Sequence, residues 1–185
     1  MTAKTKYLAL LRGINVGGKN KVPMAGLKGM LEDIGLTEVS TYIQSGNAMF
    51  RSDLAAGTLA RRIEQTLTTA FRLDDELVKV LVVRRDELQA VIDNRPEGFG
   101  DQPDRYHSDA IFLIDIDRDE AFAVFKPREG VDKVWPGNGV IYSQRLSAER
   151  TRSRLSSIVA SPLYKSMTIR SWQTTLKLLE LMAEK

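Results

Sequence analysis

The stretch LLRGINVGGKNKVP, residues 10–23, concentrates groups that bind anions. It holds Arg12, Lys19 and Lys21, three glycines and no acidic residue. Glycines let backbone amides approach an anion closely, and a guanidinium adds a planar, two-pronged donor. We therefore predict a ligand-binding segment made of Arg12, Asn15, Gly17, Gly18, Lys19 and Lys21.

Read from Gly13, the same segment spells G-x-x-x-x-G-K, close to the phosphate loop of nucleotide hydrolases. In such loops a Ser or Thr follows the lysine, and a helix begins at once. Here Asn20 follows Lys19, and the residue before Pro23 is pushed into extended geometry, which delays any helix. The dinucleotide spacing G-x-G-x-x-G is absent. The sequence therefore argues against a hydrolase or kinase loop.

A second polar stretch, Gln44-Ser45-Gly46-Asn47, separates two short apolar runs. Its amide side chains would add hydrogen-bonding selectivity, so we predict that Gln44, Ser45 and Asn47 complete the ligand site. The alternative is purely structural, because Gly and Asn are also what tight turns need. No base is evident for Ser45, so nucleophilic catalysis lacks support and catalytic residues stay unassigned.

A second anion site is predicted at Arg170, Ser171, Trp172 and Thr174, where a strand passes into a helix. Free amides and the positive end of the helix dipole would favour an anion there. The alternative makes Ser171 an ordinary helix cap and Trp172 a core residue.

Other chemistry is limited by composition. The 185 residues include no cysteine and one histidine, His107, which excludes disulfides and thiolate chemistry and makes a histidine-rich metal site impossible. We predict no metal site and no cofactor. The short apolar run after the first six residues is too short for a signal sequence or a membrane span, so we expect a cytoplasmic protein with no membrane association.

The net charge of +3 hides an uneven distribution. Residues 1–31 carry six basic and no acidic residues, and residues 145–177 carry seven basic and one acidic. Between them the chain is acidic. If the two basic segments meet in space, they form a positive patch suited to phosphates or acidic partners.

Hydrophobic spacing predicts the order strand, helix, strand, strand, helix, strand twice along the chain, each time with a trailing helix. The first half has strands at 6–12 and 78–83, a helix from about Met24, two strands around the QSGN turn and a helix capped by Asp53. The second half has strands at 110–114, 132–135, 140–143 and 167–170, and helices after Asp117, around 155–159 and over 172–182.

This order matches the ferredoxin-like βαββαβ arrangement. We predict an α+β fold of two tandem ferredoxin-like halves, with antiparallel sheets covered by helices. The halves cover residues 1–94 and 109–185, and the Pro- and Gly-rich residues 95–108 form a linker. In this arrangement the first and second strands run the same way, so the Gly-rich segment and the QSGN turn should be neighbours.

The residues LALLRGINVGGKNKVPMAGLKGML, followed by TYIQSGNAMF, resemble the opening of the bacterial domain-of-unknown-function 1697 family. The end, TIRSWQTTLKLLELM, is similar to that family's end, where asparagines are more usual than Ser171 and Gln173. The resemblance covers nearly the whole chain. It implies a fold of two ferredoxin-like halves and no established activity.

Three classes of function remain open. The protein could bind a phosphate-bearing small molecule or a nucleic-acid backbone, it could be an enzyme acting on an anionic metabolite or nucleotide, or it could be a structural or partner-binding module. The usual RNA-binding plait displays aromatic residues on its third strand, where this chain offers only Phe50, so nucleic acid would be held chiefly through phosphates. Ligand identity and oligomeric state do not follow from the sequence.

Overall fold

The structure, a computed structural model, describes residues 4–74 and 78–183. It is an α+β fold with two four-stranded antiparallel sheets and helices. The chain divides into two compact units, Met1–Leu88 with Leu179–Lys185, and Gln89–Leu178. Each unit contains one sheet.

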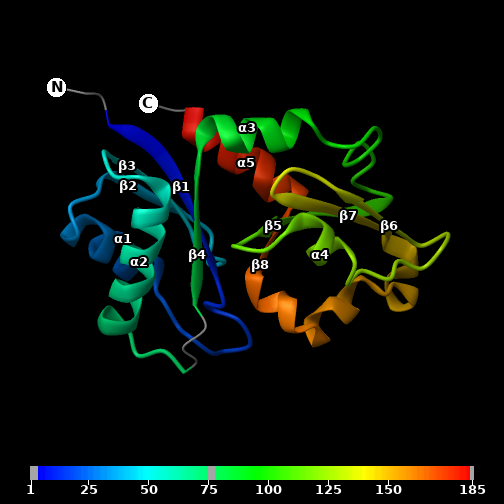
Figure 1. Ribbon diagram of the computed structural model, residues 1–185, viewed down its shortest axis with the longest axis horizontal. Helices are drawn as coiled ribbons and strands as arrows, with labels where there is room; N and C mark the ends of the chain where they lie inside the picture. Colours follow the sequence, from blue (N-terminus) through cyan, green and yellow to red (C-terminus); the bar gives the residue numbers. More distant parts are fainter. Residues whose placement is uncertain (1–3, 75–77, 184–185) are drawn as a thin grey trace. The chain divides into compact units, whose positions relative to one another are not determined.

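The first unit is a sheet with two helices on one face (Figure 1). The strands lie in the order β2-β3-β1-β4. Its elements are β1 (Thr5–Arg12), α1 (Met24–Asp33), β2 (Thr37–Tyr42), β3 (Asn47–Ser52), α2 (Ala56–Ala70) and β4 (Lys79–Arg84). Helix α3 (Arg85–Asp93) follows directly.

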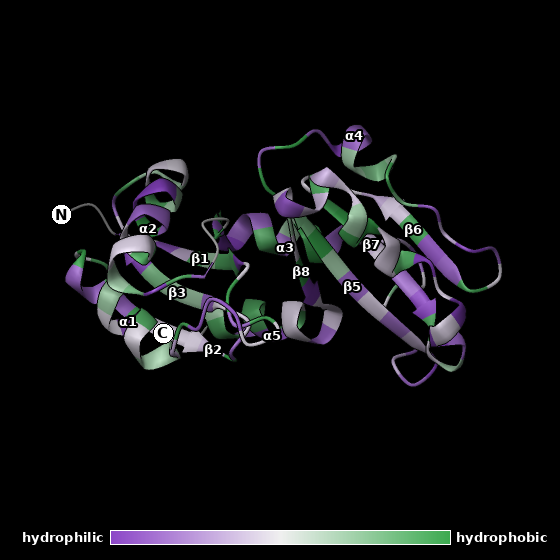
Figure 2. Ribbon diagram, turned by 90° about the horizontal axis from the view of Figure 1, so that it is seen from below, coloured by the Kyte–Doolittle hydropathy of each residue, from purple (hydrophilic) through white to green (hydrophobic). Residues whose placement is uncertain are grey.

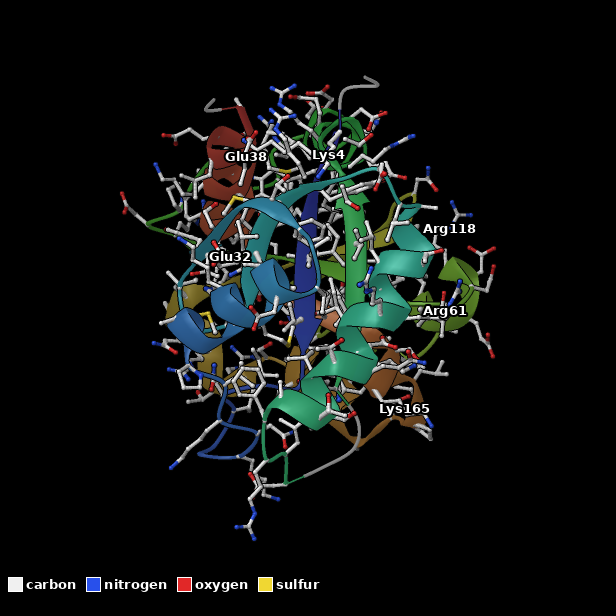
Figure 3. The ribbon with its side chains drawn as sticks, turned by 90° about the vertical axis from the view of Figure 1, so that its left-hand side faces the viewer. Lys4, Glu32, Glu38, Arg61, Arg118 and Lys165 are labelled. Atoms are coloured by element: carbon white, nitrogen blue, oxygen red, sulfur yellow. The ribbon has the colours of Figure 1, made fainter. Side chains whose placement is uncertain are left out.

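Alternation along β1 separates the two faces of this sheet. Tyr7, Ala9 and Leu11 pack with α1 and α2, because every second side chain of a strand points the same way. The helices contribute residues at three- and four-residue spacing, namely Leu27 and Leu31 from α1 and Leu59, Ile63 and Leu67 from α2. In Figure 3 both helices stand in front of β1, with Glu32 on α1 and Arg61 on α2.

The second unit repeats this plan with the strand order β6-β7-β5-β8. One face of its sheet packs Ile111, Leu113 and Ile141 against α4 and the following 3₁₀ helices. The elements are β5 (Tyr106–Leu113), α4 (Arg118–Phe122), β6 (Asp132–Pro136), β7 (Val140–Leu146), three 3₁₀ helices at Ser147–Arg152, Leu155–Ala160 and Pro162–Ser166, β8 (Met167–Ser171) and α5 (Trp172–Ala183).

The opposite face of this second sheet carries an aromatic cluster. The ring of Phe99 is fully buried and lies edge-on to Trp135, Tyr142 and Trp172, with centroid distances of 5.9, 5.2 and 5.0 Å. Edge-to-face pairs of this kind stabilise a core beyond the area that they bury. Phe99 therefore fixes part of residues 95–108 to the second sheet.

Two local expectations are wrong. Asp53 does not cap α2: the helix begins at Ala56, Ala55 stands at its N-cap, and no side chain bonds there. Around 155–159 the chain forms 3₁₀ turns instead of an α-helix. Serine hydroxyls bond the backbone there, as Ser157 Oγ does when it donates to the Arg154 carbonyl at 2.7 Å, and such local bonds compete with α-helix.

Candidate functional site

The Gly-rich segment forms a small hairpin beyond the end of β1. The amide of Asn15 donates to the Asn20 carbonyl, and that of Lys19 to the Val16 carbonyl, both at 3.0 Å. Gly17 and Gly18 form its tip with φ of +58° and +78°, a backbone that two-residue hairpin turns require. Within the described part of the chain, neither tip amide has an acceptor. Both amides are therefore available to an anion.

The Asn15 side chain joins this hairpin to the QSGN turn. Its Nδ2 donates to the carbonyls of Val22 and Gln44, both at 2.9 Å, and its Oδ1 accepts from the Val22 amide at 2.8 Å. The bond to Gln44 confirms that the two segments, far apart in sequence, are neighbours. The side-chain amide of Asn15 already bonds main-chain groups, so a direct contact between Asn15 and a ligand stays a prediction.

Asn20 anchors the other arm of the hairpin. Its side chain is buried, and it exchanges two bonds with Asp74: the Asn20 amide donates to Asp74 Oδ2 at 2.8 Å, and the Asp74 amide donates to Asn20 Oδ1 at 2.7 Å. Asn20 Nδ2 also donates to the Gly13 carbonyl at 2.8 Å. Sequence reasoning noted Asn20 only as the residue where a phosphate loop has Ser or Thr, and missed this anchoring.

The QSGN turn divides into buried and exposed residues. Asn47 is fully buried, and its Nδ2 donates to the Tyr42 carbonyl at 2.8 Å and to Ser45 Oγ at 3.0 Å. The Gly46 carbonyl accepts from the Leu11 amide at 2.9 Å, which ties the turn to β1. Gln44 and Ser45 are exposed, so they are the members of the turn that a ligand can reach.

Cationic side chains gather at this end of the first sheet. Arg12 lies opposite Lys79 in the β1–β4 register, so the two point to the same face of the sheet. Lys19 and Lys21 are exposed, and neither forms an ion pair within the described residues. The exposed charges of Lys19 and Lys21 make a positive potential beside the hairpin, which favours an anion.

At the second predicted site, the structure shows a capped helix and a packed ring. Ser171 Oγ accepts from the Thr174 amide at 3.2 Å and donates to Thr174 Oγ1 at 2.9 Å, so it caps α5. Trp172 is buried against Phe99. Arg170 is buried too, and burial lowers its pKa to about 10, which leaves it a cation at neutral pH. Anion binding by these residues stays a prediction.

A polar cluster in the second unit was missed by sequence reasoning. Three of its members lie in one row across the strands, where Asp132 faces Arg145 and Arg145 faces His107. His107 Nε2 lies 3.0 Å from Asp109, whose pKa is raised by burial although His107 and Arg145 oppose the rise. Figure 2 shows the polar ends of β5 and β7 side by side.

Period-two spacing was the signal that could have found this cluster. His107 and Asp109 continue the face of β5 that Ile111 and Leu113 bury, so polar groups had to lie beside a core. Among the residues that the structure describes, three buried atoms here find no hydrogen-bond partner: Arg128 Nε, Asp132 Oδ1 and Arg145 Nε. Among the described residues, no group of three or more His, Asp or Glu could hold a metal ion.

The fold and the loop geometry define a class: an α+β protein of two four-stranded antiparallel sheets, the first with a basic hairpin at its end. The model of the family described as "Protein of unknown function (DUF1697)" matches residues 4–142, and the chain belongs to that family.

A solved structure has a similar fold. The chain is similar to conserved bacterial protein SP0830 from Streptococcus pneumoniae, with 28% sequence identity and a TM-score of 0.78, over 97% of this chain and 99% of that one. No curated protein matches the chain. The helices within residues 4–74 and 78–183 are too short or too polar to cross a bilayer.

Proposed function

We propose that the protein binds a phosphate-bearing ligand, a small molecule or a nucleic-acid backbone, at the hairpin of residues 15–20. The observation that carries the proposal is the tip itself, where the amides of two adjacent exposed glycines, Gly17 and Gly18, make no backbone hydrogen bond within the described residues. The exposed Lys19 follows them directly in the chain. Successive backbone amides in a turn form a concave anion site. Arg12 and Lys21 add charge from either end of the segment.

The build of the hairpin supports a role beyond turning the chain. Its base is held by the side chains of Asn15 and Asn20, whereas a side chain added at Gly17 or Gly18 would contact nothing within 4 Å. The tip therefore contributes no packing to the first unit. A rigid base under an exposed tip is what a preorganised binding loop needs.

Three finer assignments accompany this proposal. We propose that both units are ferredoxin-like, which their element and strand orders support. We propose halves at residues 1–94 and 109–185 with a connecting segment at 95–108. A cytoplasmic location in bacteria is also proposed, because a chain without cysteine suits a reducing compartment.

The test is a thermal-shift screen followed by titration calorimetry with inorganic phosphate, pyrophosphate, sugar phosphates and nucleotides. A ligand at about a hundredfold over its Kd adds about 2.7 kcal/mol of stability, which for a chain of this size raises Tm by about 2–4 °C per kcal/mol. Lys19→Ala should weaken binding about tenfold or more without lowering the Tm of the free protein.

Lys28→Ala is the matched control. It removes the same charge from the same unit, but Lys28 lies on α1 as an exposed partner of Glu32. If both variants weaken binding equally, the attraction is a diffuse charge effect and the hairpin is not the site. If no phosphate compound shifts the Tm, the proposal fails.

A further inference from the structure

Two of the large apolar side chains that the fold leaves exposed lie at this same site. Val16 is 67% exposed and Ile43 is 46% exposed. Val16 belongs to the hairpin and Ile43 immediately precedes Gln44, whose carbonyl accepts the Asn15 side chain. Scattered apolar residues on a surface need no explanation, but two on adjoining turns beside cations mark a binding surface.

Ile43 also has an unusual backbone. Its φ is +49°, in the left-handed region that Gly and Asn tolerate and that a β-branched side chain adopts only with strain. Nearly half of its surface stays exposed, so burial offsets only part of this strain. A glycine would suit the backbone of this turn better, and contact between the isoleucine side chain and a ligand would account for its presence.

Gln44 supplies the third component. Its side chain is exposed, and within the described residues the amide group makes no hydrogen bond. A side-chain amide offers a donor and an acceptor together, the pair that reads the edge of a nucleobase.

We propose that the phosphate-bearing ligand is a nucleotide, with its phosphate on the tip amides and Lys19 and its base against Ile43 and Val16, where Gln44 contacts the base edge. This assignment rests on the proposed function of the hairpin. A free nucleotide and a nucleotide within a nucleic-acid strand both present this unit, a nucleoside monophosphate.

The experiment compares inorganic phosphate, ribose 5-phosphate, the four nucleoside monophosphates and a short single-stranded RNA by titration calorimetry. At least one nucleotide should bind tenfold or more tightly than ribose 5-phosphate. Ile43→Gly should abolish that difference while leaving Tm unchanged or higher, because glycine relieves the strained φ. Gln44→Ala should reduce the discrimination among the four bases. Val159→Ala, at an exposed apolar residue of the second unit, is the control.

Each outcome has a defined meaning. Tighter binding of the RNA supports a nucleotide within a strand, and tighter binding of a monomer supports a free nucleotide. Nucleotides that bind no better than ribose 5-phosphate, or an Ile43→Gly variant that keeps the full difference, overturn the nucleotide assignment and leave the phosphate site standing. Failure of every phosphate compound to bind overturns both proposals.

Discussion

Asn15, Asn20 and Asn47 use their side chains as substitutes for main-chain groups. Asn15 bonds main-chain groups of Val22 and Gln44, and Asn20 bonds those of Gly13 and Asp74, so both tie the hairpin to the chain around it. Asn47 bonds the Tyr42 carbonyl in the neighbouring turn. Asn15 and Asn20 themselves have φ of +55° and +47°, which asparagine tolerates better than most residues. The order of this end of the sheet therefore depends on three amide side chains as well as on the buried apolar residues Leu11, Ile14 and Val22.

Asn15→Ala should destabilise the protein strongly. The variant leaves the carbonyls of Val22 and Gln44 and the Val22 amide without their partner, and it puts alanine at positive φ. We expect a loss of about 2–3 kcal/mol in the free energy of unfolding, measured by urea denaturation. Gln44→Ala is the control, because Asn15 bonds the Gln44 carbonyl and not its side chain, and it should change stability by less than about 0.5 kcal/mol. Equal effects would show that Asn15 does not hold the turn.

Asp109→Asn should stabilise the protein, and more so as the pH rises. The folded-state pKa of Asp109 is raised by burial, so the folded protein binds this proton more tightly than the unfolded chain does. The stability that the protonated form contributes is complete below the unfolded pKa and is lost as the pH rises through the folded one. His107 and Arg145 oppose this loss without cancelling it.

The measurement for Asp109 is the difference in urea midpoint between variant and parent from about pH 3.5 to about pH 7.5, the range that spans carboxylate titration. The difference should grow with pH. Asp104→Asn, at an exposed residue near the start of the same strand, should show no such trend. A difference that shrinks with pH would mean that the pairing with His107 and Arg145 outweighs burial.

The sequence predicted where the candidate residues lie in the first sheet, but it did not predict their hydrogen-bond partners. β1 and β2 both run antiparallel to β3, so their carboxyl ends lie at the same end of the sheet. Arg12 and Gln44 are placed at that end by the strand order alone. The side chain of Asn15 donates to the carbonyls of Val22 and Gln44. The positions of these carbonyls depend on the tertiary structure, so the bonds could not be predicted from the sequence. For the same reason the row of Asp132, Arg145 and His107, which lies across three strands, could not be predicted from one strand at a time.

Among the helices, two N-caps were predicted from aspartate residues, and one of the two predictions is confirmed. Asp117 caps α4 as expected, because its carboxylate accepts from the amides of Asp119 and Glu120. Asp53 offers the same side chain, yet Ser52 Oγ bonds the Leu54 amide and the helix starts later. A capping residue identifies a helix start only when no neighbouring hydroxyl competes for the backbone.

Ser171→Ala should remove the cap of α5. The hydroxyl accepts from the Thr174 amide, and losing such a cap costs about 1 kcal/mol. The expected fall in Tm is about 2–4 °C for a chain of this size. Ser171→Thr keeps the hydroxyl and should restore most of the difference in a calorimetric melt. An unchanged Tm in the alanine variant would free Ser171 for the anion site predicted from the sequence.

At the scale of the whole molecule, the two units share a main-chain tether as well as a strand order. The Leu11 amide donates to the Gly46 carbonyl at 2.9 Å in the first unit, and the Leu113 amide donates to the Gly139 carbonyl at 3.0 Å in the second. In each case the first strand of the unit is tied to the turn before its third strand. The units therefore share a plan, while the basic hairpin belongs to the first alone.

Gly46 and Gly139 occupy equivalent turns of the two units, and alanine variants at these positions separate the cost of backbone strain from the cost of local packing. Both have positive φ, +88° and +70°, so alanine at either should cost about 1–2 kcal/mol in backbone strain. At Gly46 an added Cβ would also lie 2.7 Å from Ile14 Cδ1 and 2.9 Å from Leu11 Cβ, whereas at Gly139 it would meet nothing within 4 Å. Urea denaturation should therefore show Gly46→Ala to be less stable than Gly139→Ala by at least about 1 kcal/mol, the lower bound for overpacking.

Because Ile14 leads directly into the hairpin, Gly46→Ala should also weaken phosphate binding, and Gly139→Ala should leave it intact. Equal losses of stability would mean that Ile14 shifts freely, and a hairpin that loose could not be the preorganised site proposed for the first unit.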